Sequence, residues 1–242
     1  MPMMSLLRDI CAPRTAVVAD GNEALFARLA KELPLTVFRF KSGDSCNGWI
    51  VPDNWRGKRA QIFRDGKPVF DGAGQALAVG YYSRSVSGEL DWEDLKPKLV
   101  TNPALPEATM FHCMWQYRPW DADWRLCVPH TTYQSLGPGV YRVELETERE
   151  PGEMIVAHSH KAGQSEKTIV FSAHTCHPHM ANDGFAGVAL FVRLMQWLAE
   201  RETFYSYRFV TGPEHIGTVF YLRDLPVDDV NRLVSGCFQE MP

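Results

Sequence analysis

The chain has 242 residues, of which 45% are hydrophobic and 22% are charged, and both fractions are typical of a folded globular protein. Its formal net charge is −4 and its lysines and arginines are dispersed, so we expect no nucleic-acid partner, which would require a basic surface. No stretch approaches the roughly 18 consecutive apolar residues of a membrane-spanning helix, so we expect no membrane partner either.

The N-terminal residues show no basic segment followed by an apolar one, so they do not resemble a signal peptide. Six cysteines are spread along the chain, without any Cys-x-x-Cys pair. In a chain of this length such cysteines are typical of reduced, mostly buried thiols rather than of a disulfide framework. We therefore expect a cytoplasmic protein.

The first elements form the start of a mixed α/β pattern. Residues 20–33 place apolar side chains with helical periodicity, and residues 35–40 alternate as a strand does. Residues 46–150 contain short apolar runs separated by Gly, Pro, Asn and Asp, together with six of the seven tryptophans. This pattern predicts a β-rich region. Its aromatic side chains would form either the packed core of that region or the wall of a substrate pocket.

After residue 150 strands and helices alternate regularly. The predicted strands are 152–160, 167–175, 205–212 and 233–239, and the predicted helices are 184–200 and 214–222. Such alternation predicts an α/β core with a mainly parallel sheet. We therefore predict a core formed by residues 1–45 and 151–242, which is incomplete at its C-terminal end, and an inserted β-rich subdomain of residues 46–150.

Three polar clusters follow three of the predicted strands. His174–Asp183 follows one strand, Glu214 and His215 follow the next, and Glu240 follows the last. In open α/β sheets ligands bind at the carboxyl ends of the strands. The sequence therefore predicts that these clusters form one site.

The segment after residue 173 has the composition of a metal site. His174, His177, His179 and Asp183 lie within ten residues, and Cys176 is a further potential ligand. Imidazole nitrogens and carboxylate oxygens are the usual ligands of catalytic zinc. Solvent-facing loop histidines are the alternative, but three histidines within six residues, together with an aspartate, favour a metal.

Glu214 has two interpretations. An acidic residue at the start of a helix stabilises the helix dipole. At the same sheet edge as the histidines, however, its carboxylate is placed to act as a general base toward metal-activated water. The neighbouring His215 is either a metal ligand or a residue on the helix surface.

These residues also carry a family resemblance. The runs SAHTCHPHMANDGFAGVALF (172–191) and YRFVTGPEHIGTVFYL (207–222) resemble a group of bacterial aminopeptidase-like proteins defined by a domain of unknown function. That group is similar to the co-catalytic zinc aminopeptidases, whose relatives include glutamate carboxypeptidase. The resemblance extends upstream through residues 124–148 and 49–55, and it implies a zinc-exopeptidase-like three-layer α/β/α core with an inserted β-rich subdomain.

The resemblance also implies roles for individual residues. The family's strand-terminal histidine and bridging aspartate, both metal ligands, match His174 and Asp183. Its Glu-Glu-x-Gly motif, a base followed by a ligand, matches Glu214 and His215. Its further ligand at the end of the next strand matches Glu240.

The sequence departs from this pattern in four places. Cys176 replaces the aspartate that normally stands two residues after the first histidine, and the shorter loop makes His177 an alternative ligand. His215 replaces the second glutamate. The family's last histidine would lie beyond residue 242, so the chain is a fragment, or a partner chain completes the site, or the site holds a single metal.

From these features we predict a zinc-dependent aminopeptidase-like hydrolase, a metalloprotease or amidohydrolase that binds one or two zinc ions. It would cleave a peptide or amide bond in a small substrate, with Glu214 as general base and His174, His177, Asp183, His215 and Glu240 as metal ligands. The alternatives are a catalytically reduced relative acting as a binding or assembly module, and a mononuclear-metal enzyme that hydrolyses non-peptide amides. A homo-oligomer or a completing partner chain is compatible with each.

Overall fold

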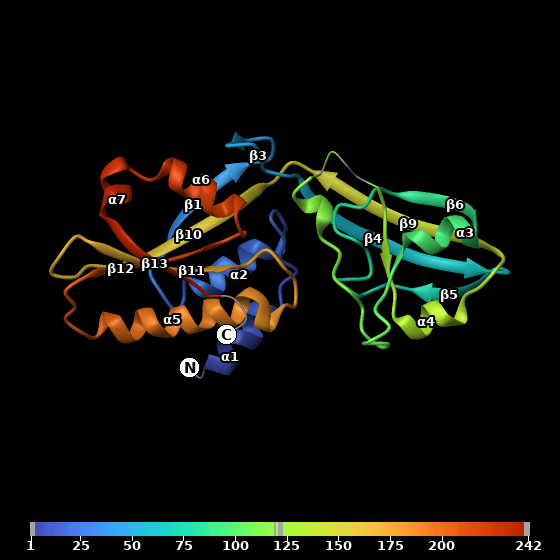
Figure 1. Ribbon diagram of the computed structural model, residues 1–242, viewed down its shortest axis with the longest axis horizontal. Coiled ribbons are helices and arrows are strands. Elements are labelled where there is room, and N and C mark those ends of the chain that lie inside the picture. The colour runs from blue at the N-terminus through green and yellow to red at the C-terminus, as the bar shows by residue number, and fades with distance from the viewer. Residues whose placement is uncertain (1–2, 119, 121–122, 240–242) are drawn as a thin grey trace. The chain divides into compact units, whose positions relative to one another are not determined.

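The computed structural model describes residues 3–118, 120 and 123–239 of the chain, and Figure 1 shows its elements in chain order. Residue contacts divide the chain into two compact units, Met1–Asn54 with Pro151–Pro242, and Trp55–Glu150. The second unit begins at Trp55, whereas the predicted insertion begins at residue 46. Among the described residues, no helix combines the length and the apolar character needed to cross a membrane.

The first unit is built on a five-stranded sheet in the order β1-β10-β12-β11-β13. β11 pairs in parallel with β12 and β13, whereas the pairs β1–β10 and β10–β12 are antiparallel. The strands are β1 (Thr36–Lys41), β10 (Glu153–Lys161), β11 (Thr168–His174), β12 (Ser206–Gly212) and β13 (Leu233–Phe238).

The sheet is therefore mixed, where the sequence predicted a mainly parallel one. Only residues 162–167 connect β10 to β11, and a parallel crossover needs about a dozen residues or more. So short a link reverses the chain direction, which makes β10 antiparallel to the strands that follow. The sequence pattern identified β10 as a strand but did not indicate its direction.

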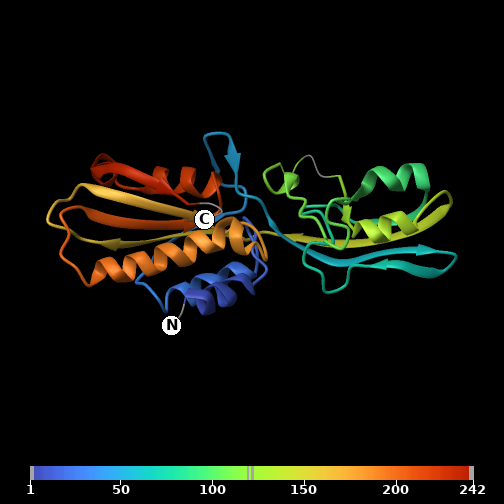
Figure 2. The same cartoon turned by 60° about the horizontal axis from the view of Figure 1, so that its bottom comes forward.

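Helices cover both faces of this sheet, which confirms the predicted α/β class with three layers. Figure 2 shows the blue α1 and α2 and the orange α5 on one face, and the red α6 and α7 on the other. The helices are α1 (Met3–Cys11), α2 (Gly21–Leu29), α5 (Ala186–Ala199), α6 (Ile216–Asp224) and α7 (Val227–Arg232).

Successive side chains of β10 point alternately to the two faces of the sheet, so this strand packs against both helical layers. Ile155 and Ala157 are buried in the apolar cluster shared with α1, α2 and α5. Val156, between them, faces the opposite side, where its side chain lies close to Gly217 of α6. Successive strand side chains point to opposite faces, so a strand covered on both sides is apolar throughout, as β10 is at these positions.

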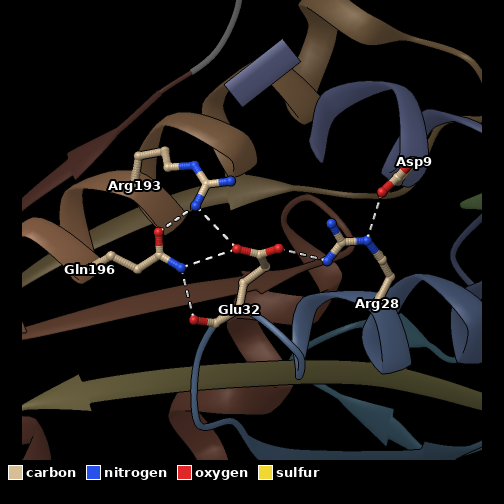
Figure 3. A network of polar contacts seen from close by, with 5 residues as sticks. All are labelled: Asp9, Arg28, Glu32, Arg193 and Gln196. Atoms are coloured by element: carbon tan, nitrogen blue, oxygen red, sulfur yellow. Dashed lines mark hydrogen bonds and ion pairs between the residues drawn. The ribbon is translucent and has the colours of Figure 1, made fainter. Parts of the chain in front are cut away.

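A polar network joins the three helices of the first layer (Figure 3). Arg28 donates to Asp9 and to Glu32, at 2.9 Å each, and Arg193 and Gln196 each donate to Glu32 at 3.1 Å. Burial alone raises the pKa of the Glu32 carboxyl group, but the hydrogen bonds from Arg28 and Gln196 and the nearby guanidinium charges lower it overall. We call these five residues the helix-layer network.

The second unit contains a four-stranded sheet in the order β5-β4-β9-β6 and a short parallel pair, β7–β8. Tyr82 and Tyr141 are fully buried, and Trp55 and Trp124 nearly so, which places these four aromatic side chains in the unit's core. Its strands and helices are β4 (Asn54–Arg64), β5 (Lys67–Asp71), β6 (Val86–Asp91), α3 (Trp92–Leu95), η1 (Lys96–Lys98), β7 (Leu99–Val100), η2 (Met114–Gln116), β8 (Leu126–Cys127), α4 (His130–Ser135) and β9 (Val140–Glu150).

Candidate metal centre

The carboxyl ends of three strands meet at one edge of the five-stranded sheet. His174, the last residue of β11, pairs with Gly212, the last residue of the parallel strand β12. The N–H of Gln239, just after β13, donates to the carbonyl of Ser172 at 2.9 Å. Because the strands are parallel and in register, polar residues that follow them collect at this edge.

A tight turn carries the chain from β11 back toward its own end. Residues Ala181–Phe185 form a single irregular turn before α5, and within it Gly184 has a φ of 91°. A Cβ atom at this position would lie 2.6 Å from the carbonyl oxygen of His174. Glycine is therefore required both by the backbone conformation and by the close approach, and the turn brings Asp183 next to His174.

Two imidazoles face the carboxylate of Asp183. His174 Nε2 lies 3.0 Å from Oδ1, and His177 Nδ1 lies 3.8 Å from Oδ2. The two rings are perpendicular, with centroids 5.0 Å apart. Both histidines are buried, whereas the Asp183 side chain is 31% exposed. The structure thus brings together three of the predicted ligands, of which the carboxylate of Asp183 is the partly exposed one.

The charge state of His177 suits a metal ligand. Burial lowers the pKa of its imidazole, and a positive charge on His174 lowers it further, while the carboxylates of Asp183 and Glu214 act in the opposite direction. The net shift favours the neutral ring at neutral pH. Neutral imidazole is the form that donates a nitrogen lone pair to a cation.

Cys176 lies between the same two rings. Its Sγ atom is 3.5 Å from His174 Nδ1 and 3.9 Å from His177 Nε2, and the residue is fully buried. In the described part of the chain, His174, Cys176 and His177 form the group whose ligand atoms lie close enough, within 4.8 Å of one another, to hold a metal ion. Nitrogen and sulfur donors of this kind are typical of zinc.

Glu214 follows β12 and reaches the same site through its backbone. Its N–H donates to Cys176 Sγ at 3.5 Å, and its carboxylate lies 3.1 Å from His215 Nε2. The predicted helix begins at Ile216 rather than at Glu214, so Glu214 lies in the loop at the strand end. This position agrees better with a role in the site than with stabilisation of a helix.

His215 is not brought into the group of His174 and His177. Its side chain is 69% exposed, and its ring is stacked on Trp49 at 6.3 Å between centroids. Trp49 is held there by the hairpin β2 (Ser45–Cys46) and β3 (Trp49–Ile50), whose turn residues Asn47 and Gly48 both have positive φ. The predicted ligand Glu240 lies outside the described residues.

Sequence comparison identifies the family to which this chain belongs. The model of the family described as a domain of unknown function, DUF4910, matches residues 4–241. The chain is a member of this family. A Clostridium acetobutylicum protein, described as a polysaccharide biosynthesis protein with an aminopeptidase-like domain, is 28% identical over 223 residues, which cover 90% of this chain and 50% of that protein.

Solved structures show the same fold. A protein from Clostridium acetobutylicum described as a peptidase superposes with a TM-score of 0.85 at 26% identity, covering 99% of this DUF4910 chain and 56% of that one. BSAP, a zinc aminopeptidase from Bacillus subtilis, has a TM-score of 0.62 at 15% identity, covering 99% and 68%. The fold is therefore aminopeptidase-like, and the DUF4910 chain spans about half the length of its Clostridium relatives.

Two contacts of the centre were not predicted from the DUF4910 sequence. The buried Thr15 donates its hydroxyl to the carbonyl of His177 at 2.7 Å, and His179 Nδ1 lies 3.1 Å from the carbonyl of Cys11. Both contacts anchor the histidine loop to a segment more than 160 residues away along the chain. No local pattern around Thr15 signals this role, because only the fold brings the two segments together.

Proposed function

We propose that this chain carries the metal centre of a zinc-dependent aminopeptidase-like hydrolase. The observation that carries the proposal is the convergence of His174, His177 and Asp183 at the carboxyl edge of the sheet, with Glu214 at the adjoining strand end. Two imidazoles and a carboxylate are the donor set of many catalytic zinc sites. The aminopeptidase-like fold supports the same assignment.

The donor atoms fit a zinc ion. The 3.0 Å between His174 Nε2 and Asp183 Oδ1 allows one cation to lie about 2 Å from each atom, as zinc–nitrogen and zinc–oxygen bonds require. The Asp183 side chain is 31% exposed, whereas the facing nitrogens His174 Nε2 and His177 Nδ1 are buried, so the carboxylate is the accessible side of the donor set. When bound, zinc polarises a carbonyl group and lowers the pKa of water.

Glu214 is the proton carrier in this proposal. Its side chain is 24% exposed, so it is accessible to water and to a substrate at the sheet edge. Its carboxylate accepts a proton from the attacking water and delivers it to the leaving amine, as a general base and then a general acid. His215, at 3.1 Å, helps to hold the carboxylate in place.

We propose a small peptide or an amide-containing metabolite as substrate. The donor set directs the chemistry to a carbonyl flanked by a leaving amine, and the relative described as a polysaccharide biosynthesis protein makes amide-bearing sugar derivatives worth assaying beside aminoacyl-anilides.

The test combines metal analysis with an assay of hydrolysis. Purified protein should contain zinc, and its cleavage of aminoacyl-anilides should stop on addition of a chelator and return with zinc. Glu214→Gln should retain zinc but lose roughly 10²- to 10⁴-fold in turnover, the usual contribution of a general base. Glu200→Gln, an identical change at a side chain that is 79% exposed, should have wild-type activity.

Other outcomes would replace the proposal. Protein that binds no zinc would indicate a binding or assembly module. Bound zinc with hydrolysis of simple amides but not of anilides would favour a non-peptide amidohydrolase. Full activity of Glu214→Gln would exclude Glu214 as the base.

A further inference from the structure

We propose that Cys176 is a positioning residue of the metal centre, whose sulfur accepts the inner N–H groups of His174 and His177 and so directs their outer nitrogens to the metal. The proposal rests on the metal site described above and assigns a role to a residue that is not itself a ligand. Its basis is the way in which the two imidazoles lie between a sulfur and a carboxylate.

Each histidine presents one nitrogen to Cys176 and the other to Asp183. His174 places Nδ1 at 3.5 Å from the sulfur and Nε2 at 3.0 Å from the carboxylate. His177 has the opposite arrangement, with Nε2 at 3.9 Å from the sulfur and Nδ1 at 3.8 Å from the carboxylate. Each ring therefore lies between the sulfur of Cys176 and the carboxylate of Asp183.

This arrangement determines which nitrogen is available to a cation. A neutral imidazole carries one proton, and the hydrogen bond made by the protonated nitrogen fixes the tautomer. When the sulfur accepts from His174 Nδ1 and from His177 Nε2, the lone pairs lie on the nitrogens that face Asp183. Partners of this kind, behind the metal-binding nitrogen, orient histidine ligands in metalloproteins and strengthen metal binding.

The directions of the ring nitrogens distinguish positioning from direct coordination, since His174 is as buried as Cys176. Cys176 is fully buried behind the rings, whereas Asp183 is 31% exposed on their other side. The two nitrogens of an imidazole point in different directions, so a cation between His174 Nε2 and Asp183 has the His174 ring between itself and the sulfur. A single ion at that position does not reach Cys176.

The same sulfur also links the ligands to the general base. The backbone N–H of Glu214 donates to it at 3.5 Å, so three donors from two different strand ends converge on one atom. Loss of the sulfur should therefore loosen both the histidines and the backbone at Glu214. A buried methyl group in its place would leave these N–H groups without their acceptor.

The experiment measures metal binding in variants of Cys176 in the full chain. Cys176→Ala should weaken zinc affinity roughly 10- to 100-fold, the usual effect of removing a partner of a metal-binding histidine. Cys176→Ser retains an acceptor oxygen and should lose less. The matched control is Cys127→Ala, since Cys127 is also fully buried but belongs to the second unit, and its zinc affinity should equal that of the wild type.

Cobalt substitution tests the positioning role separately from folding. The Co(II)-loaded wild type should show ligand-field bands without a sulfur-to-cobalt charge-transfer band in the near ultraviolet, and Cys176→Ala should alter the ligand-field bands. A charge-transfer band that disappears in Cys176→Ala would make the cysteine a direct ligand and overturn the inference.

Equal zinc affinity of Cys176→Ala and wild type would also overturn it, while leaving the hydrolase proposal intact. Wild-type protein that binds zinc but hydrolyses nothing would overturn the hydrolase proposal and leave the positioning role of Cys176 intact. Wild-type protein that binds no zinc would exclude both proposals.

Discussion

Two polar clusters in the first unit are built from different kinds of group. In the helix-layer network, guanidinium and amide donors surround the carboxylates of Glu32 and Asp9, so each negative charge lies beside a donor (Figure 3). In the metal centre, two imidazoles lie between a carboxylate and a sulfur. The first cluster balances its own charge, whereas the second gathers atoms that bind cations.

The difference separates a structural role from a functional one. A network of opposite charges at partly buried positions fixes three helices relative to one another without a bound ion. Clustered imidazole, carboxylate and thiol groups gain most when a metal ion joins them. Changes in the first cluster should therefore alter stability alone, and changes in the second should alter metal binding.

The largest effect is expected at Asp183. Asp183→Ala removes the carboxylate that faces both imidazoles, so zinc affinity should fall by roughly 100-fold or more, at least as much as the loss of an outer partner costs. Zinc titration against a competing chelator dye measures this affinity. The exposed Asp228 provides the control, because Asp228→Ala should bind zinc as the wild type does. Unchanged affinity in Asp183→Ala would remove this carboxylate from the site.

A smaller effect on stability is expected at Glu32. Glu32→Gln removes the charge that Arg28 and Arg193 face, and should lower the free energy of unfolding at pH 7 by about 2 kcal/mol, as for other hydrogen bonds to charged groups. Zinc affinity should not change. Denaturant unfolding of Glu32→Gln beside Glu200→Gln measures the difference, and a loss of zinc affinity in Glu32→Gln would show that the two clusters are coupled.

The effect at Glu32 should depend on pH in a defined direction. Its pKa is lowered in the folded protein, so the charge contributes stability above the unfolded-state value of about 4.3. That contribution is lost as the pH falls through the folded-state pKa. The difference in the free energy of unfolding between Glu32→Gln and wild type should therefore disappear in acid. A difference that persists there would show that the effect comes from packing.

The smallest effect is expected at Thr15, which connects the N-terminal segment to the histidine loop. Thr15→Val preserves the shape of the side chain but removes its hydrogen bond to the His177 carbonyl, so we expect a loss of about 1 kcal/mol in stability. Zinc affinity should fall less than in Cys176→Ala. Thermal unfolding with and without zinc measures both, and the exposed Thr36 supplies the control Thr36→Val.

Local sequence patterns predicted most of the core. The segments that became β10 and β11 were both identified as strands, as was the helix that became α5. These elements have a strong periodicity because their side chains face a buried layer. By contrast, α1 and α7 were not predicted, and the sheet is mixed rather than mainly parallel because the direction of β10 depends on its neighbouring strands.

The metal site could be predicted from the sequence because most of its proposed ligands cluster in one loop. His174, His177 and Asp183 lie within ten residues, and Glu214 follows the next strand. His215 was predicted as a ligand because it matches the second position of the family's Glu-Glu-x-Gly motif. Its exposure and its stacking on Trp49 depend on a hairpin that lies far away in the chain. The predictions for His215 and Glu240 as ligands remain predictions.

By itself the sequence determined the elements of the core and the residue types at its strand ends, because periodicity and ligand clustering are local properties of a chain. The tertiary structure decided which nitrogen of each histidine faces Asp183, that the sulfur of Cys176 lies behind both rings, and that Thr15 supports the loop. These features depend on register between parallel strands and on the close approach at Gly184, which arise only when distant segments pack together.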